Sequence, residues 1–447
     1  MIHKHSLTWV ALFGVIVLMF LQLPPMAAKQ DSVIHTYSAL VEVDALAKQQ
    51  FVDPIEDDRL VDGAIRGMMF QLDPYSGYIS PSELSAFERR SRGDFNGVGL
   101  ELGMQSGQLT VIAPVDGSPA VQAGVLAGDT LLSIDGHKLE GRSVFDVEEM
   151  LVGPPGTRVH LEVRHPGQHD AQRLTVVRGP VHLKTVRGFR RDRSRAWDYM
   201  IDREAHTGYI RVSSFRDNTM RDFDAALTEL LDGGARAMVL DLRFNPGGVM
   251  PQAVAMVDRF VNDGLILSTV TRRRAIDEYM AVREGTVENL KLVVLINGSS
   301  ASAAEIVAGS LQARGRAVVV GERSFGKGSV QHLIHLAGHK AAIKLTVAYY
   351  RLPDGRIIHR TDKNALTDLW GVTPDVKVTL SEDEVQVIQE SRRKLDVSFS
   401  ESAPSTPAAA GEVVSGSPLP ELIRDAQLEA AMSVARAPTL PRSMGSP

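Results

Sequence analysis

The first residues that could do chemistry lie in a serine-rich segment from Asn297 to Gly315 (NGSSASAAEIVAGSLQARG). An apolar strand is predicted to end at Asn297, and an alanine-rich helix is predicted to begin near Ala301. A serine at that junction would lie beside unsatisfied backbone N–H groups, which suit an oxyanion, and its hydroxyl could attack a carbonyl. A structural alternative stays open, because Ser299 or Ser300 could simply cap the helix.

A lone lysine between glycines, Lys327 in GERSFGKGSVQ, could supply a base for such a serine. Flanking glycines predict a tight backbone that delivers the lysine to a defined place, and a lysine serves as a general base where burial lowers its pKa. Serine–lysine pairs of this kind need no histidine. The alternative is a solvated turn lysine. If a strand begins near Ser329, Gln331 shares its face, and the Gln331 amide could hold the lysine amine.

A third segment, LDLRFNPGGV (Leu240 to Val249), predicts a buried strand that runs into Asn-Pro-Gly-Gly. Its glycines permit backbone N–H groups to point at a ligand, although the segment could equally be a plain turn between a strand and a helix. Together the three segments offer a nucleophile, a base and an oxyanion hole, each at the end of a strand or helix.

With these three motifs the chain resembles the carboxy-terminal processing (tail-specific) peptidase family, over roughly residues 35 to 395. Four further segments within this range carry the same resemblance. Beyond it, DAQLEAAM (Asp425 to Met432) resembles the closing helix of the family. The four are LDPYSGYISPSE (Leu72 to Glu83), FNGVGLEL (Phe95 to Leu102), VGPPGTRVHLEVR (Val152 to Arg164) and GVTPDVKV (Gly371 to Val378).

The resemblance implies a role for each matching position. Ser302 would be the nucleophile, Lys327 the general base, and Gln331 the residue that orients the lysine. The oxyanion hole would be formed by the backbone N–H groups of Ala303 and of Gly247 or Gly248. Two departures are visible: the family usually has serine at Ala304, and the segment from His359 to Trp370 is longer and more polar than expected. Neither departure touches the three implied catalytic positions.

A separate module precedes the implied catalytic core. The run Gly97-Val98-Gly99-Leu100 resembles the PDZ loop whose backbone amides hold a peptide's terminal carboxylate, after which the peptide adds as a strand. The stretch from Ser118 to Gly136 is similar to the common PDZ core. In the family such a domain recognises unstructured C-termini and gates the active site, which is the expectation here.

The remaining patterns predict a multidomain α/β protein. Helical spacing runs from Asp31 to Arg92 and is broken by turn residues at Leu72 to Pro81. Short strands follow, with an Asp135-Gly136 hairpin, and then strands alternate with helices, which favours a layered α/β core. The resemblance implies that this core is of the crotonase/ClpP-like type. The expected divisions are a signal peptide or anchor (1–28), a helical region (31–92), a PDZ-like domain (93–180), a protease core (181–395), a disordered linker (396–418) and a C-terminal helix and tail (419–447).

Composition restricts the other function classes. The net charge of 49 − 54 = −5 gives no indication of a nucleic-acid partner, and the absence of cysteine removes thiol nucleophiles, disulfides and thiolate metal sites. No cofactor is expected. A basic start, the apolar run from Leu7 to Leu23 and the small residues Ala27 and Ala28 predict export to a bacterial periplasm or cell envelope. The run is either a cleaved signal or an uncleaved membrane anchor. Expected partners are proteins with unstructured C-termini, an adaptor protein and a second copy of the chain.

Three other functions compete with a Ser–Lys peptidase. A catalytically silent PDZ scaffold or chaperone would be expected to have lost Ser302, Lys327 or Gln331. A Ser-His-Asp hydrolase would need His332 or His335 at the site, but no Gly-x-Ser-x-Gly elbow surrounds Ser302. A metalloprotease lacks support because the chain has no His-Glu-x-x-His motif.

Overall fold

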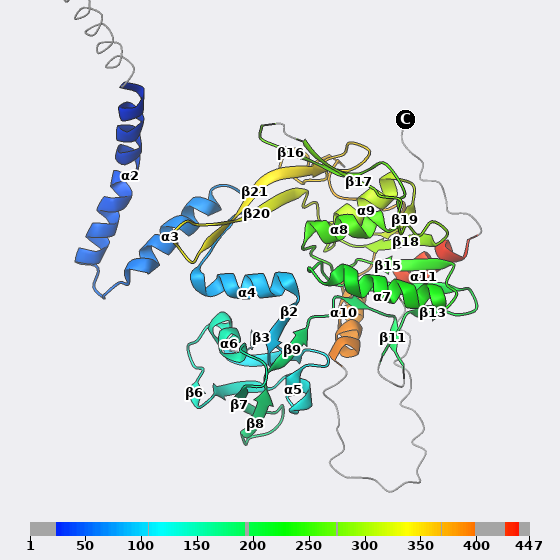
Figure 1. The fold of residues 1–447 in the computed structure, drawn as a ribbon, viewed down its shortest axis with the longest axis horizontal. Coiled ribbons are helices and arrows are strands. Elements are labelled where there is room, and N and C mark those ends of the chain that lie inside the picture. The colour runs from blue at the N-terminus through cyan, green and yellow to red at the C-terminus, as the bar shows by residue number, and fades with distance from the viewer. Residues whose placement is uncertain are drawn as a thin grey trace, which may run out of the picture. The chain divides into compact units, whose positions relative to one another are not determined.

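The computed structural model describes residues 24–105, 107–192, 196–273, 276–367, 369–397 and 425–437. The chain divides into two compact units, residues 1–78 and 79–447 (Figure 1). The apolar run from Leu7 to Leu23 lies outside the described residues, and so does the predicted linker (396–418) from residue 398 onward. Its first two residues, Asp396 and Val397, are described and belong to a helix. Within the described ranges, no helix has both the length and the apolar character needed to cross a bilayer.

The first unit is helical, as the spacing predicted. Helix α2 spans Pro24–Gln50, which is an earlier start than expected, and α3 spans Asp57–Phe70. An apolar face is exposed on α2, where the side chains of Leu40, Val43 and Leu46 are 44%, 63% and 44% exposed. Among the residues described, no other part of the unit covers this apolar helical face.

The PDZ-like domain forms its own sheet, with strand order β3-β4-β5-β7-β8 and β6 paired with β5. The Asp135-Gly136 hairpin is confirmed, since both residues have positive φ between β5 and β6. Val111, Val147 and Leu161 are fully buried in a core of the domain's own. Its elements, with the flanking α4, are α4 (Pro81–Arg92), β2 (Asp94–Gly97), β3 (Leu100–Gln105), β4 (Gln108–Pro114), α5 (Pro119–Gln122), β5 (Thr130–Ile134), β6 (His137–Lys138), α6 (Val144–Leu151), β7 (Arg158–Arg164), β8 (Gln172–Val177) and β9 (Gly179–His182).

The predicted α/β core is a seven-stranded mixed sheet. Strands β14 (Thr207–Val212), β15 (Ala237–Asp241), β18 (Lys291–Ile296), β19 (Ala317–Gly321) and β22 (Val376–Lys377) run parallel, while β10 (Val186–Arg187) and β13 (Met200–Asp202) pair antiparallel with β14. The buried strand predicted to run into Asn-Pro-Gly-Gly and the apolar strand predicted to end at Asn297 are therefore confirmed as β15 and β18.

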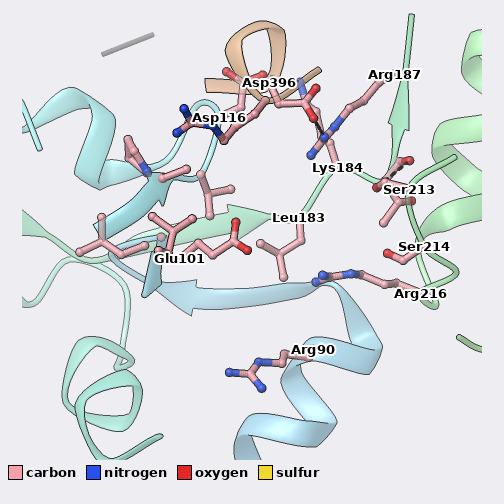
Figure 2. Close-up of a pocket in the computed structure, with 18 of the residues that line it drawn as sticks. Arg90, Glu101, Asp116, Leu183, Lys184, Arg187, Ser213, Ser214, Arg216 and Asp396 are labelled. Carbon is pink, nitrogen blue, oxygen red and sulfur yellow. Dashed lines mark hydrogen bonds and ion pairs between the residues drawn. The ribbon is translucent and has the colours of Figure 1, made fainter. Parts of the chain in front are cut away.

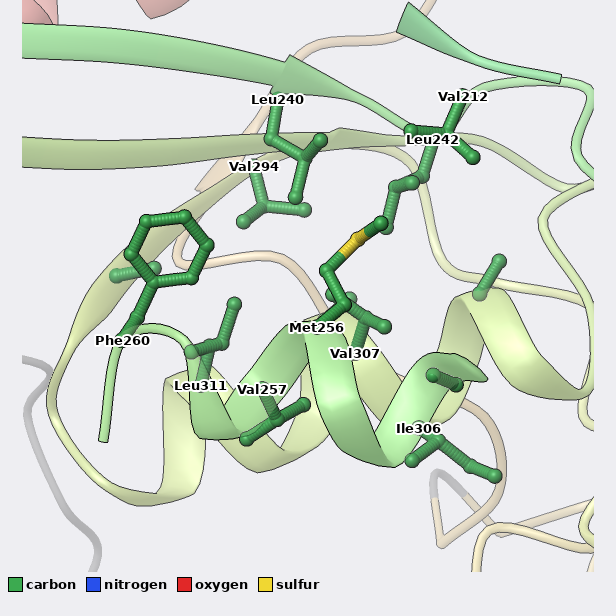
Figure 3. Close-up of a cluster of buried hydrophobic side chains, with 14 of the residues drawn as sticks. Val212, Leu240, Leu242, Met256, Val257, Phe260, Val294, Ile306, Val307 and Leu311 are labelled. Atoms are coloured by element: carbon green, nitrogen blue, oxygen red, sulfur yellow. The ribbon is translucent and has the colours of Figure 1, made fainter. Parts of the chain in front are cut away.

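Helices cover both faces of this sheet because the side chains of each strand alternate between faces. On one face α7 (Thr219–Asp232), α8 (Met250–Asp258) and α9 (Ala303–Ala313) bury Leu240 and Val294 beneath Met256 and Val307 (Figure 3). On the other face α11 (Ala426–Arg436) packs against neighbouring strand residues such as Val239, Val293 and Val318. The C-terminal helix expected from residues 420 to 436 is thus an integral layer of the core.

A second antiparallel sheet was not predicted. It contains β16 (Leu265–Thr271), β17 (Ile276–Met280), β20 (Ser329–His335) and β21 (Ala342–Arg351). Strand β20 begins at Ser329, as predicted, and Ser329 and Gln331 therefore lie on the same face of the strand. Helix α10 (Glu382–Val397) and the small pair β11 (Arg190–Arg191) and β12 (Trp197–Asp198) were likewise not predicted.

Candidate active site

Three loops carry the predicted chemistry, and they meet because they follow parallel strands β15, β18 and β19. The carboxyl ends of neighbouring parallel strands lie at one edge of a sheet. Backbone hydrogen bonds join the loops there: Ala301 N donates to Asn245 O (2.9 Å), and Phe325 N donates to Ser300 O (3.0 Å). The Asn297 side chain adds a third link by accepting from Phe244 N (3.0 Å). The structure therefore brings the serine, lysine and glycine segments together.

Ser302 lies at the N-cap of α9, where the sequence placed a candidate nucleophile. Its backbone has φ 55° and ψ −115°. A non-glycine residue in this region costs about 1–3 kcal/mol and persists only where surrounding contacts hold it. The neighbouring Ser300 has a structural role, because its buried hydroxyl donates to Leu242 O (2.8 Å).

The buried carboxylate of Glu305 holds the serine and lysine loops together. Its Oε2 accepts from the backbone N–H groups of Ser302 (2.8 Å) and Lys327 (2.8 Å), and its Oε1 accepts from Gly326 N (2.7 Å) and Ser324 Oγ (2.5 Å). Burial raises the pKa of Glu305, and these four hydrogen bonds oppose the rise. Glu305 was assigned no role from the sequence, although the pattern Ser-x-x-Glu at a helix start is the signal that could have found it.

Close packing explains the glycines beside Lys327. A Cβ on Gly326 would lie 2.9 Å from the Arg360 Cβ, and a Cβ on Gly328 would lie 2.5 Å from His359 N. The segment from His359 to Trp370, one of the two departures from the family pattern, therefore covers the lysine loop. The Tyr350 hydroxyl also donates to the Lys327 carbonyl, which ties the lysine backbone to β21.

Gln331 lies on β20 on the same face as Ser329, as predicted. Its amide Nε2 donates to Ser329 Oγ (2.9 Å) and Thr346 Oγ1 (3.1 Å). These bonds fix the amide at the strand that leads out of the lysine loop. That Gln331 orients the Lys327 amine stays a prediction.

The two glycines of the third motif differ in their backbone N–H groups. Gly247 N donates to Asn245 Oδ1 (2.8 Å), whereas Gly248 N and Ala303 N have no hydrogen-bond partner in the part of the chain that is described. Both glycines have positive φ, 94° and 141°, and both approach neighbours closely. A Cβ on Gly247 would lie 2.7 Å from the Ser302 Cβ, so the glycine loop lies directly against the serine.

A buried ionic cluster that no sequence pattern indicated supports this loop. Arg243, only 1% exposed, contacts Asp241 (2.7 Å) and forms a bidentate pair with Asp425 (2.8 Å for both bonds). The guanidinium groups of Arg243 and Arg392 hold the pKa of Asp241 far below its usual range despite complete burial. Because Asp425 caps α11, the cluster joins the C-terminal helix to the strand that leads into the glycine loop.

The predicted PDZ loop is held by its neighbours but leaves one donor available. Gly99 O accepts from Val115 N (2.9 Å) and Ser118 Oγ (3.1 Å), while Gly99 N has no partner among the residues described. The loop borders a cavity of about 720 Å³ whose other walls come from α10 and from the core, including Arg216 (Figure 2). A peptide end placed at this loop would therefore also face residues of the catalytic core.

The two histidines that a Ser-His-Asp hydrolase would need lie on β20. His332 and His335 are exposed on β20, and His335 lies 3.9 Å from Glu88. No group of three or more potential metal ligands occurs in the described ranges.

The chain is similar to known proteins in three kinds of comparison. The family model of peptidase family S41 matches residues 206–378, and the PDZ domain model matches residues 110–165. The model of the activating protease CtpB N-terminal domain matches residues 22–82. A carboxy-terminal-processing protease of Bartonella bacilliformis is 34% identical over 376 residues, which is 82% of this chain and 80% of the relative. The carboxy-terminal processing protease CtpA of Bacillus subtilis is 31% identical over 334 residues, or 74% and 67%. A solved photosystem II D1 C-terminal processing protease is 28% identical and covers 81% of this chain and 97% of its own, with a TM-score of 0.43.

Proposed function

The chain belongs to the carboxy-terminal-processing proteases of peptidase family S41, and from this premise we propose that Ser302, Lys327 and Gln331 carry out its peptidase reaction. The protein is a serine-type peptidase with a PDZ domain that binds peptide C-termini. The observation that carries the assignment is the Glu305 carboxylate, which binds the Ser302 and Lys327 backbones through one oxygen.

The proposed reaction begins with attack of Ser302 Oγ on the scissile carbonyl carbon. The neutral Lys327 amine takes the hydroxyl proton as the C–O bond forms, and Gln331 orients that amine. The N–H groups of Gly248 and Ala303 then bind the oxyanion, since the Gly247 N–H is already engaged by Asn245. Lys327 returns its proton to the leaving amine as the C–N bond breaks. A water molecule hydrolyses the acyl-enzyme by the same steps.

The test uses the full chain as wild type and as Ser302→Ala, Lys327→Ala and Ser299→Ala variants. Each is incubated with an unstructured protein that ends in apolar residues, and fragments are identified by mass spectrometry. Loss of either member of the pair should lower the rate by several orders of magnitude. The exposed Ser299 controls for the loss of a neighbouring hydroxyl. Cleavage by folded Ser302→Ala at the wild-type rate would contradict the assignment.

We also propose that the protein is exported and that a second copy of the chain covers the apolar face of α2. Export is supported by the basic start and the apolar run from Leu7 to Leu23. Dimer formation is supported by the exposed side chains of Leu40, Val43 and Leu46 on that face, at 44%, 63% and 44%. Cell fractionation and sedimentation of a Val43→Asp variant test the two parts separately. An adaptor that presents substrates is also proposed, and co-purification with the Ser302→Ala chain tests it.

A further inference from the structure

The cavity beside the PDZ loop is strongly cationic. Nine arginines and Lys184 line it, against four carboxylates, those of Glu101, Asp116, Glu148 and Asp396. Most of these cations are already neutralised: Arg191 pairs with Asp116 (3.0 Å), and Arg187 and Arg211 both pair with Asp396. A cation without a carboxylate partner is therefore the one that can best bind an anionic ligand in this cavity.

Two of the lining cations, Arg216 and Arg393, make no side-chain hydrogen bond or ion pair within the described ranges. They differ in burial, because Arg393 is exposed, whereas the Arg216 Nη1 is buried and has no hydrogen-bond partner among the residues that the structure describes. A buried guanidinium nitrogen without an acceptor is costly and uncommon in a folded protein. Among the described residues that line this cavity, Arg216 is therefore the cation best suited to bind an anionic ligand.

Arg216 belongs to the catalytic core but faces the PDZ groove. It extends from the loop after β14 toward Leu183 and Glu101, and Glu101 is the second residue of β3, the strand that a bound peptide would join (Figure 2). Burial lowers the pKa of Arg216, while the charge of Glu101 raises it and the charge of Arg90 lowers it. A carboxylate close to the end of a bound tail would thus lie within reach of Arg216.

The backbone beside Arg216 is joined to the oxyanion loop. Phe215 N donates to Gly247 O (2.9 Å), and Phe215 O accepts from Val249 N (2.9 Å). Arg216 directly follows Phe215, the residue that is hydrogen-bonded to the glycine loop. A tail bound by Arg216 is consequently one residue away from that contact. This places the site between tail recognition and the reaction centre.

We propose that the Arg216 guanidinium binds a carboxylate of the substrate tail while the tail occupies the PDZ groove. The inference rests on the proposed function, because it requires tail binding by the PDZ domain. The carboxylate comes either from the tail terminus or from an acidic side chain beside it. In both cases the catalytic core, and not the PDZ domain alone, determines which tails are bound.

The test measures binding of two fluorescent peptides to the full chain carrying Ser302→Ala, which prevents cleavage. The peptides share an apolar last residue and a free terminal carboxylate, differ only by Glu or Gln in the penultimate position, and contain no other acid. Arg216→Gln should weaken binding about ten-fold to a hundred-fold, as expected for a lost charge-assisted hydrogen bond. Arg216→Lys should recover part of this loss. The matched control, Arg393→Gln, removes the same charge from the same cavity and should change affinity less than about three-fold.

A loss confined to the Glu peptide assigns the contact to the side chain. An equal loss with both peptides, partly recovered by Arg216→Lys, assigns it to the terminus. Unchanged affinity in Arg216→Gln, an equal loss in Arg393→Gln, or no recovery by lysine in a folded variant would overturn the inference. In each of those outcomes the Ser302→Ala parent chain still binds both peptides and the wild type still cleaves its substrate, so the proposed function stands. Absence of binding in the parent would instead overturn tail binding by the PDZ domain together with the inference.

Discussion

Replacing Glu305 with glutamine should damage both stability and catalysis without creating a cavity. Each Glu305 oxygen accepts two hydrogen bonds, so an amide with one acceptor oxygen leaves two of the four donors without a partner in either orientation. An unsatisfied buried donor costs about 1–3 kcal/mol, so the free energy of unfolding should fall by about 2–6 kcal/mol. In one orientation the orphaned donors are the N–H groups of Ser302 and Lys327 themselves.

Catalysis should suffer because these two N–H groups set the positions of the nucleophile and the base. Displacement of reacting groups by about 1 Å can cost about a hundred-fold in rate, and kcat/KM of Glu305→Gln should fall by about that factor. Urea unfolding measures the stability change, and initial rates on a tail peptide measure kcat/KM. The control is Glu284→Gln, which alters an exposed carboxylate in the same domain.

A specific result would refute this reasoning. That result is a free energy of unfolding of Glu305→Gln within about 0.5 kcal/mol of the wild-type value, together with cleavage at a similar rate. In that case the substitution has not left two of the four donors without an acceptor. Glu305 would then carry a proton in the folded enzyme, which glutamine imitates well. Burial raises the pKa of Glu305, which is the direction that favours the protonated form.

Three further predictions concern the glycine loop, the C-terminal helix and the PDZ domain. Gly247→Ala should lower kcat/KM by about 10²–10³-fold in initial-rate assays, because its Cβ would lie 2.7 Å from the Ser302 Cβ and displace the oxyanion loop; near-normal rates would contradict this packing. Asp425→Asn should lower the free energy of urea unfolding by about 1–3 kcal/mol, since it weakens the bidentate pair with buried Arg243; an unchanged unfolding midpoint would count against the tether. Burial lowers the pKa of His165, but its contacts with Asp129 (2.7 Å) and Gln172 (2.8 Å) outweigh burial and leave the pKa above the usual 6.5. A raised histidine pKa means that this stabilisation is complete below pH 6.5 and is lost as the pH rises through the raised value. Thermal unfolding across that range should show the decline, and His165→Gln should remove it.

The sequence alone determined the family, the order of the modules and the strands of the parallel sheet. Runs such as AMVLDLR and LKLVVLIN are apolar on both faces, so they indicate buried strands without any tertiary information. Local chemistry likewise marked three segments, because a serine, a lysine and paired glycines, each at the end of a strand or helix, rarely occur together by chance. The choice of Ser302 within its segment, and the role of each position, came from the family resemblance.

Only the tertiary structure decided which groups complete the site. The pairing of Asp425 with Arg243 joins residues 182 positions apart, and the second sheet assembles strands from Leu265 to Arg351, so neither leaves a local pattern. Which glycine N–H is available depends on the Asn245 side chain. The Arg216 Nη1, which has no hydrogen-bond partner among the described residues, lies in the cavity lined by both the core and the PDZ loop. Hydrogen-bond satisfaction and burial are properties of the assembled chain, and for that reason residue types and spacing could not predict them.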